Sequence, residues 1–434
     1  MTECPTSMSS LTWLGYDLLM SAAPRVLSFE DARRAVEQQA ALVQATETES
    51  THLLDAAGRV LAESVHADRD LPPFPRSTRD GYAVRSADLA KVPATLEVIG
   101  EIKAGEKFER IPKVGCGQAA SIMTGAPVPS GADAVVMVEY TSQQGAKVEF
   151  SRGVTSGENI VPRGAEAREG GLLIDRVAPL NEATVALAAS AGKSRLLVYK
   201  RPRVAVLTTG DEIVPIDTIP GPTQIRNSNS HSLAVQIQRS GGESVLLPIA
   251  PDERTGLRNL IEEGLRADLL LMTGGVSMGR YDLVEQVLAE MQADFFFTGA
   301  KIQPGRPVVF GKCGPGPARE KQASYFFGLP GNPVSTMVTF ELFVRPMVER
   351  LAGMSPRKLT FVYAKLKSEI RVKPGLKRFL PANLSGEFEN SEVELVPWQG
   401  SGDIAATARA NCYLVIPSDR DHIPAGEFVA ILKR

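Results

Sequence analysis

The sequence of 434 residues is too long for one hydrophobic core and predicts several domains; 43% of the residues are hydrophobic and 23% are charged, as in ordinary globular proteins. The formal net charge of −2 offers no basic surface for nucleic acid, so no nucleic-acid partner is expected. Four widely spaced cysteines without a CxxC pair indicate neither a disulfide framework nor a zinc site and fit a reducing cytoplasm, and with four histidines the carboxylates are expected to do the ionic chemistry.

Residues 1–23 contain an apolar patch that Asp17 interrupts. The patch is too short to span a bilayer, and no Lys or Arg precedes it. We therefore interpret residues 1–23 as a poorly ordered extension and expect no association with a membrane.

Two helical segments and a β domain are predicted before residue 201. Ser28, followed by Glu30 and Asp31, is typical of a helix N-cap, and this helix is predicted to run to about Val43. A second, apolar helix is predicted over residues 182–191. Short strands separated by turns predict an all-β domain over 69–164, inserted into a discontinuous helical or linker domain of residues 24–68 and 165–200.

Strands alternate with helices from Arg203 onward, which predicts an α/β domain over 201–353 with a central parallel sheet. Ligands bind such sheets outside the carboxyl ends of the strands. Four of these ends carry polar or Gly-rich residues: Asp211 with Glu212, Asp252, the loop from Gly274 to Asp282, and Asn332. Residues 354–434 return to a strand pattern and predict a small, barrel-like β domain that closes the chain.

The loop from Gly274 to Asp282 follows a buried apolar strand and precedes a helix. Backbone N–H groups and the positive end of a helix meet in such a loop, which suits a phosphate or another oxyanion. A carboxylate in the same place, Asp282, indicates Mg²⁺ between the two negative groups. The alternative is a tight connection from strand to helix without a ligand.

Three strand-end carboxylates, Glu212, Asp252 and Asp282, could converge on a hard cation that also takes phosphate oxygens as ligands. Alternatively, each is a helix cap or a solvated acid. Lys301 and Arg306 flank a Pro-Gly turn and either hold an anion or stay solvated. Further hydroxyl and amide groups at strand ends belong to Thr208, Thr209, Asn227, Asn229 and Ser277.

Other reaction classes lack their residues in this sequence. There is no evident Ser-His-Asp set and no GxxxxGK[ST] phosphate loop, which argues against a hydrolase with a covalent intermediate and against a P-loop ATPase. The residues by themselves therefore indicate a Mg²⁺-assisted site for a phosphorylated ligand.

Six motifs in series resemble the MoeA family of molybdopterin molybdenumtransferases, which is similar to the E domains of gephyrin and of plant Cnx proteins. The resemblance covers nearly everything after about Pro24. The motifs are LPPFPRSTRDGYAVRSADL (71–89), SIMTGAPVPSGADAVVMVE (121–139), VAVLTTGDEIV (204–214), LLMTGGVSMGRYDLV (270–284), QPGRPVVFG (303–311) and FGLPGNPVSTMVTFELFVRP (327–346).

This resemblance implies an elongated four-domain homodimer whose α/β domain is of the molybdopterin-binding type. The active site would lie between the α/β domain of one subunit and the inserted β domain of the other. The implied reaction inserts molybdate into adenylylated molybdopterin, with Mg²⁺-dependent release of AMP. A molybdopterin adenylyltransferase and molybdoenzymes or cofactor carriers would be transient partners.

The resemblance also assigns roles to residues. The family's functional positions fall on Asp80, Thr124, Glu212, Asp252, Asp282, Pro330, Pro333 and Ser401. Glu212, Asp252 and Asp282 would hold Mg²⁺, and the loops at 274–279 and 330–335 would cradle the pterin phosphate. The expected substrate-binding residues are Gly125, Thr209, Gly210, Asn229, Gly274, Gly275, Ser277, Gly279, Lys301, Pro304, Arg306, Pro330, Asn332, Pro333, Ser335, Arg378 and Ser401.

The chain departs from the family pattern at several charged positions. Two lysines that are common before the Pro-Gly turn fall on Gly299 and Gln303, and an expected arginine in the last domain falls on Pro381. Molybdate needs cationic or N–H donors, which leaves Lys301, Arg306 and Arg378 to supply them. After the inserted domain, where the family often has Gly-Glu-Asp, the chain has Gly164-Ala165-Glu166.

Three alternatives remain open at this point. The chain could be a molybdopterin adenylyltransferase, because the 270–284 motif resembles that family too, although that family usually has a single α/β domain. It could be a non-catalytic scaffold of the same fold, as gephyrin is for receptors. It could also take tungstate in place of molybdate.

Overall fold

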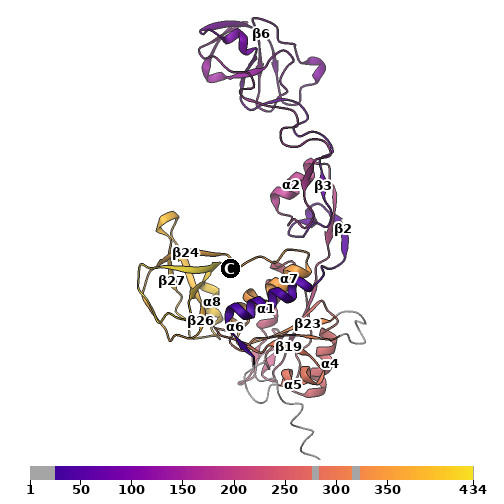
Figure 1. Ribbon diagram of the computed structural model, residues 1–434, viewed down its shortest axis with the longest axis vertical. Coiled ribbons are helices and arrows are strands. Elements are labelled where there is room, and N and C mark those ends of the chain that lie inside the picture. The colour runs from indigo at the N-terminus through magenta and orange to yellow at the C-terminus, as the bar shows by residue number, and fades with distance from the viewer. Residues whose placement is uncertain (1–24, 276–282, 315–322, 434) are drawn as a thin grey trace, which may run out of the picture. The chain divides into compact units, whose positions relative to one another are not determined.

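The computed structural model describes residues 25–275, 283–314 and 323–433, which divide into two units (Figure 1). The first unit contains the residues up to Glu49 and those from Tyr199 onward, and the second contains Ser50–Val198. The chain passes between the units in β2 (Thr48–His52) and β13 (Arg195–Tyr199), which pair as a two-stranded sheet. Every helix among the described residues is too short or too polar to cross a membrane.

A six-stranded sheet forms the centre of the first unit, in the order β17-β14-β18-β23-β22-β19. Its parallel strands are β17 (Glu243–Leu246), β14 (Arg203–Thr208), β18 (Leu269–Thr273) and β23 (Ser324–Leu329). One strand, β22 (Val309–Cys313), runs antiparallel to both of its neighbours, β23 and β19 (Asp294–Phe297). The predicted parallel sheet is thus interrupted by one reversed strand, because residues 314–323 are too few for the crossover of about a dozen residues that a parallel pair requires.

Helices cover both faces of this sheet. Alternate residues of a strand point to opposite faces, so Val204 and Val206 face one hydrophobic core while Ala205 and Leu207 face another. The first core also contains residues of α1 (Phe29–Leu42), α3 (Asn229–Arg239), α6 (Pro333–Thr339), a π-helical segment (Phe340–Val344) and α7 (Arg345–Leu351). The second contains residues of α4 (Arg254–Gly264) and α5 (Leu283–Glu290). Burial on both faces explains why the strands are continuous apolar runs in the sequence.

Helix α1 lies against α7 in the first unit (Figure 1). The predicted cap is confirmed, since the backbone N–H of Asp31 donates to the Ser28 hydroxyl at 3.1 Å. The apolar stripe of α1 packs on the aromatic core, and the Phe29 ring lies 5.2 Å from the Phe379 ring and 6.1 Å from the Phe343 ring. This packing places α1 with the α/β core, whereas the sequence pattern predicts that it belongs to a domain with residues 165–200.

The C-terminal residues form the predicted barrel-like β domain within the first unit. Its strands are β24 (Phe361–Leu366), β26 (Lys377–Ser385), β27 (Glu392–Leu395), β28 (Cys412–Ile416) and β30 (Phe428–Lys433). They follow the order β26-β27-β24-β30-β28, and β28 pairs back to β26, which closes the barrel. Strand β21 (Ile302–Gln303) adds to β26 and so connects the Pro-Gly turn of the α/β domain to the barrel.

Short elements complete the first unit. Asp403 caps α8 (Ile404–Arg409) by accepting from the backbone N–H of Ala406. The two-stranded pairs are β1 (Val26–Leu27) with β20 (Gly299–Ala300), β15 (Ile213–Val214) with β16 (Ile225–Arg226), and β25 (Ile370–Arg371) with β29 (His422–Ile423).

The second unit is built on a six-stranded sheet in the order β8-β5-β7-β6-β10-β9. The strands are β5 (Gly81–Val84), β6 (Ala94–Ile102), β7 (Gln118–Ile122), β8 (Ala134–Met137), β9 (Thr141–Gln144) and β10 (Lys147–Phe150). A separate core gathers Leu61, Leu180, Ala188 and Val198 around α2 (Glu182–Ser190), which Asn181 caps. The pairs β3 (Val65–His66) with β12 (Leu172–Ile174) and β4 (Arg76–Ser77) with β11 (Ile160–Val161) join the segments on either side of the sheet.

Candidate active site

The carboxyl ends of β14, β18 and β23 lie side by side in the first unit, where the sequence predicted a ligand site. Thr208 is in register with Thr273, and Thr273 with Leu329. The backbone N–H of Thr209 donates to the carbonyl of Thr273 at 3.1 Å. Gly274 follows with φ of +88°, and a Cβ on it would lie 2.3 Å from the Thr209 carbonyl oxygen. Only glycine allows the two strand ends to approach this closely.

Asn229, at the start of α3, ties these loops together. Its side-chain amide nitrogen donates to the Thr273 hydroxyl at 2.9 Å and to the Gly331 carbonyl at 2.8 Å. The Thr273 hydroxyl donates in turn to the Pro330 carbonyl. The side-chain oxygen of Asn229 is buried and has no hydrogen-bond partner among the described residues. This predicted substrate-binding residue therefore fixes the loops at 274–275 and 330–331 and retains an acceptor for a hydrogen-bond donor.

Two of the three predicted metal ligands border the same turn, Thr209-Gly210. The Thr209 hydroxyl donates to the Asp252 carboxylate at 2.8 Å, and the backbone N–H of Asp252 donates to the Asp211 carboxylate at 3.1 Å. The Glu212 carboxylate lies against Gly210, because a Cβ on that glycine would meet Glu212 Oε2 at 2.6 Å. Asp282, the third predicted ligand, lies outside the described residues, as do Ser277 and Gly279.

These carboxylates suit a hard cation whose remaining coordination positions are filled by water and substrate. Among the described residues, Asp211, Glu212 and Asp252 are exposed and form no ion pair, and no group of three or more His, Cys, Asp or Glu side chains is arranged to hold a metal. Mg²⁺ usually takes one or two carboxylates and fills its other positions with water and substrate phosphates. Glu212 and Asp252 fit that pattern.

The loop after β23 connects the α/β domain to the barrel domain. The side-chain amide of Asn332 donates to the Ser401 hydroxyl at 2.9 Å, and the backbone N–H of Val334 donates to the Ser401 carbonyl at 3.0 Å. Pro333 opens α6, and Ser335 is buried in its first turn. The structure thus brings together Pro330, Asn332, Pro333 and Ser401, which the sequence placed in one site although they come from two domains.

The predicted cations near the Pro-Gly turn differ in their surroundings. Lys301 and Arg306 are exposed, while Pro304 is buried. Gly305 packs on α6, since a Cβ on it would lie 2.4 Å from Thr339 Cγ2. The turn is therefore held in place while both basic side chains extend into solvent.

Arg378 is 6% exposed and donates to Gln303 Oε1 at 2.8 Å, to the Leu376 carbonyl at 3.1 Å and to the Lys373 carbonyl. Burial lowers the pKa of its guanidinium. All three acceptors are neutral, so these hydrogen bonds leave the buried positive charge uncompensated. That Arg378 binds an oxyanion beside Gln303 remains a prediction.

Asp80 and Thr124 meet in the second unit. The backbone N–H of Thr124 donates to Asp80 Oδ1 at 2.6 Å, and the Thr124 hydrogen bonds lower the pKa of the Asp80 carboxyl. The position of Asp80 is set by Gly81, where a Cβ would lie 1.9 Å from the Val136 carbonyl oxygen of the paired strand. Gly125 has φ of +83°, and its N–H donates to the Ser77 carbonyl at 2.8 Å.

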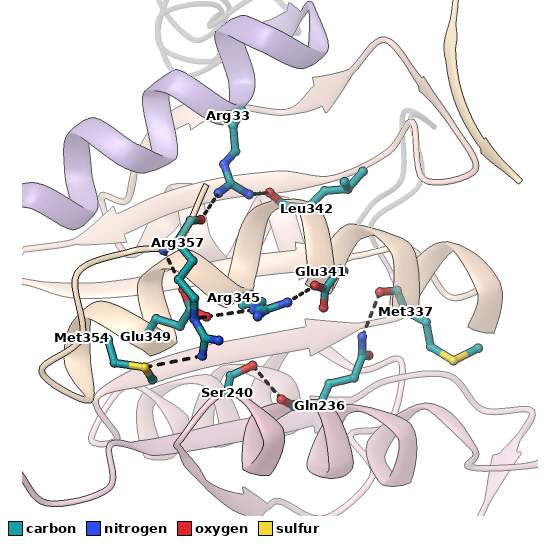
Figure 2. Close-up of polar contacts among 10 residues, drawn as sticks. All are labelled: Arg33, Gln236, Ser240, Met337, Glu341, Leu342, Arg345, Glu349, Met354 and Arg357. Carbon is teal, nitrogen blue, oxygen red and sulfur yellow. Dashed lines mark hydrogen bonds and ion pairs between the residues drawn. The ribbon is translucent and has the colours of Figure 1, made fainter. Parts of the chain in front are cut away.

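A polar network outside the strand ends was not predicted from the sequence. Glu349 is 1% exposed and pairs with Arg345 and Arg357, and Arg345 also pairs with Glu341 (Figure 2). The spacing of Glu341, Arg345 and Glu349 at four-residue intervals is a visible signal of helical ion pairs. Arg357 carries no such signal, because it follows the helix.

The fold defines a class: multidomain proteins that combine a largely parallel α/β domain, a C-terminal β-barrel and an inserted β domain. Family models match in three consecutive blocks: the MoeA N-terminal region (domains I and II) over 27–192, a probable molybdopterin binding domain over 205–350 and the MoeA C-terminal region (domain IV) over 363–433. The chain belongs to the MoeA family of molybdopterin molybdenumtransferases.

Relatives and solved structures agree along nearly the whole chain. A molybdopterin molybdenumtransferase from a Nostoc species is 35% identical over 397 residues, which cover 89% of each chain. One from Haemophilus influenzae is 33% identical over 414 residues, covering 94% of this chain and 98% of the relative. A crystal structure of the MoeA protein from Pyrococcus horikoshii is 28% identical, covers 94% of this chain and all of that one, and superposes with a TM-score of 0.75.

Proposed function

We propose that this protein is a transferase of molybdenum cofactor biosynthesis, a molybdopterin molybdenumtransferase that inserts molybdate into adenylylated molybdopterin and releases AMP. Relatives that match this chain over most of their length carry the name molybdopterin molybdenumtransferase. The observation that carries the proposal is the meeting of Glu212 and Asp252 at the Thr209-Gly210 turn, beside the glycine loop that follows β18. Hard oxygen ligands and a close-packed glycine loop suit a phosphoanhydride.

In this proposal the residues of the first unit bind and orient the nucleotide end of the substrate. Glu212 and Asp252 would hold Mg²⁺, which supplies charge neutralisation at the phosphoanhydride. The Thr209 hydroxyl donates to Asp252 and keeps that carboxylate turned toward the strand ends. Asn229 fixes the two loops that would surround the phosphate and offers its free oxygen to a substrate donor.

Molybdate would bind as a substrate near the Pro-Gly turn, where Lys301 and Arg306 are exposed and Arg378 lies buried beside Gln303. A doubly charged oxyanion is held best by guanidinium and ammonium donors. We further propose a homodimer in which Asp80 and Thr124 of one subunit complete the site of the other, and a cytoplasmic location beside the enzymes that make and use the cofactor.

The test is the release of AMP from adenylylated molybdopterin, measured with and without molybdate and Mg²⁺. Release that requires both and consumes no ATP is expected; ATP consumption would instead indicate an adenylyltransferase. Asp252→Asn should slow the release by about 100-fold, because the metal loses a charged ligand. Asp217→Asn, which removes an exposed acid from the loop after β15, serves as the matched control. Equal rates of AMP release by the two variants would contradict the proposed role of Asp252 as a metal ligand.

A further inference from the structure

A cavity in the first unit shares no residue with the strand-end site. It measures about 570 Å³ and is lined by residues of α1, α3, the run from α6 to α7, residues 357–360 and the barrel strands β28 and β30. This volume falls within the range of small-molecule sites. The proposed reaction uses none of its residues.

The wall of this cavity is strongly basic. Of its lining residues, six carry positive charge: Arg33, Arg239, Arg345, Arg357, Lys358 and Lys433. Three carboxylates pair with members of this set, namely Glu37 with Arg33, Glu341 with Arg345, and Glu349 with Arg345 and Arg357. Among the described residues the cations therefore exceed their paired carboxylates by three, which favours a multiply charged anion.

Two of the guanidinium groups share one buried carboxylate. Glu349, buried in α7, accepts from Arg345 Nε at 2.9 Å and lies 3.1 Å from Arg357 Nε (Figure 2). Burial alone would lower the pKa of Arg345, but Glu341 and Glu349 raise it, so this side chain stays charged. A guanidinium has five N–H donors. Glu349 and Glu341 occupy two nitrogens of Arg345, whereas Arg357 pairs with Glu349 and keeps further donors for a ligand. The network therefore orients Arg357 at the cavity, and the excess positive charge comes from Arg239, Lys358 and Lys433.

The remaining wall offers an acceptor and apolar surface. Gln236 lines the cavity, its amide nitrogen donates to the Met337 carbonyl at 3.0 Å, and its side-chain oxygen is buried without a partner among the described residues. Val235, Met337 and Tyr413 contribute apolar or aromatic surface. A ligand that fills this space would carry a hydrogen-bond donor and a ring or other apolar part besides its anionic group.

We propose that this cavity binds a small organic phosphate of about nucleotide size, with the phosphate at the arginine and lysine side chains and a donor group at the Gln236 oxygen. Inorganic phosphate alone would satisfy the cations but would leave the Gln236 oxygen and the apolar wall unused. This inference does not rest on the proposed transferase activity, because binding is measurable without molybdate or molybdopterin.

Isothermal titration calorimetry on the full chain tests the proposal, with guanosine 5′-monophosphate as the probe and guanosine and inorganic phosphate as comparisons. The nucleotide should bind saturably and at least about tenfold more tightly than either comparison, because only it engages both the cations and the rest of the wall. Asp252→Asn should leave the affinity unchanged, which separates this cavity from the strand-end site.

Charge-reversal variants test which basic side chains bind the phosphate. Arg239→Glu and Lys358→Glu alter exposed side chains and should together weaken nucleotide binding by about tenfold or more. Arg34→Glu is the matched control, since Arg34 adjoins Arg33 on α1, is exposed and does not line the cavity. Gln236→Leu should weaken binding of the nucleotide but not of inorganic phosphate.

Absence of saturable nucleotide binding at millimolar concentration would overturn the proposal, as would equal affinity for guanosine. An equal loss in Arg34→Glu would also overturn it, by showing that general surface charge is responsible. The comparison of nucleotide with nucleoside uses the unaltered chain, so it decides the matter even if a variant folds poorly.

Discussion

Asp80 and Thr124 lie 44 residues apart in the sequence, and the backbone N–H of Thr124 donates a short hydrogen bond to Asp80. The bond does more than join two loops, because a backbone N–H that donates to a carboxylate favours its charged form. Both residues are exposed, so the carboxylate is held ionised and oriented while open to a ligand. In the proposed dimer this is the contribution of the inserted β domain to the site.

The carboxyl of Asp80 should titrate below the ordinary aspartate value of 3.8, because the backbone N–H and then the hydroxyl of Thr124 stabilise its anion. A folded-state pKa below the unfolded one means that this group stabilises the fold above about pH 3.8 and that the contribution disappears as the pH falls through the lowered value. Carbon-detected NMR titration of the Asp80 side chain measures it. Thr124→Ala keeps the larger, backbone contribution and should keep the pKa below 3.8; a midpoint at or above that value in the unaltered chain would contradict the hydrogen bond.

Gly274, the first residue after β18, lies too close to the Thr209 carbonyl to accept a side chain. Gly274→Ala should destabilise the first unit by about 2 kcal/mol or more, because the residue has positive φ and its new Cβ would collide with the Thr209 carbonyl. Gly426→Ala is the matched control, with φ of +84° and nothing within 4 Å of the added carbon. Chemical denaturation compares the two variants. Equal losses of stability would mean that the positive φ alone accounts for the need for glycine at position 274, without a contribution from the close approach of the strand ends.

Helix α7 carries a buried ion pair whose removal should be costly. Glu349→Ala should lower the free energy of unfolding by about 3–5 kcal/mol, because it leaves Arg345 partly buried without its inner carboxylate. The exposed pair of Arg258 and Glu262 has the same four-residue spacing, so Glu262→Ala should change stability by about 0.5 kcal/mol or less. Urea titrations of both variants measure the difference. A small loss for Glu349→Ala would show that solvent reaches this pair.

Local features of single helices and strands could be predicted from the sequence, but contacts between segments distant in the sequence could not. The Ser28 cap and the apolar strands β14 and β18 could be predicted because neighbouring residues determine them. The side-chain pattern did not indicate the direction of β22, since a strand has the same pattern in either direction. Only the short connection of residues 314–323 to β23 indicates it. The contact of Asp80 with Thr124 entered through the family resemblance, because nothing in either loop indicates its partner.

The basic cavity was also beyond prediction. Arg345 could be expected to pair along its helix with Glu341 and Glu349, but the approach of Arg357 from a following segment depends on the tertiary fold. For the strand-end site, the rule that ligands bind at the carboxyl ends of strands was enough to bring Glu212, Asp252 and Asn332 into consideration.

Two units with separate cores have consequences for the unfolding of the whole molecule. Differential scanning calorimetry should resolve more than one transition, because each unit buries its own hydrophobic clusters. Gly274→Ala should lower the temperature of only the transition that belongs to the first unit. A single two-state transition that shifts as a whole would indicate that the units unfold together.

If the proposed dimer forms, a mixture of two inactive variants should recover part of the activity. Asp80→Asn and Asp252→Asn alter different units, so a mixed dimer would contain one intact site if each site draws on both subunits. After exchange of subunits, the mixture should recover roughly one quarter of the normal rate of AMP release, because about half of the dimers are mixed. Separate Asp80→Asn and Asp252→Asn preparations are the controls. A mixture no more active than its components would show that each subunit builds its site alone.

The pairing of α1 with the distant α7 region affects how the protein is made. Arg33 bonds to the carbonyl of Leu342, 309 positions further along the chain. At the usual pace of translation the ribosome needs roughly 15–60 s to cover that distance. During this interval the apolar stripe of the first helix has left the ribosome before its docking partner exists, while the whole of the second unit is synthesised and can fold. The apolar stripe of α1 is therefore exposed to aggregation during this interval. Chaperones that shield apolar helices should bind the nascent chain at this stage.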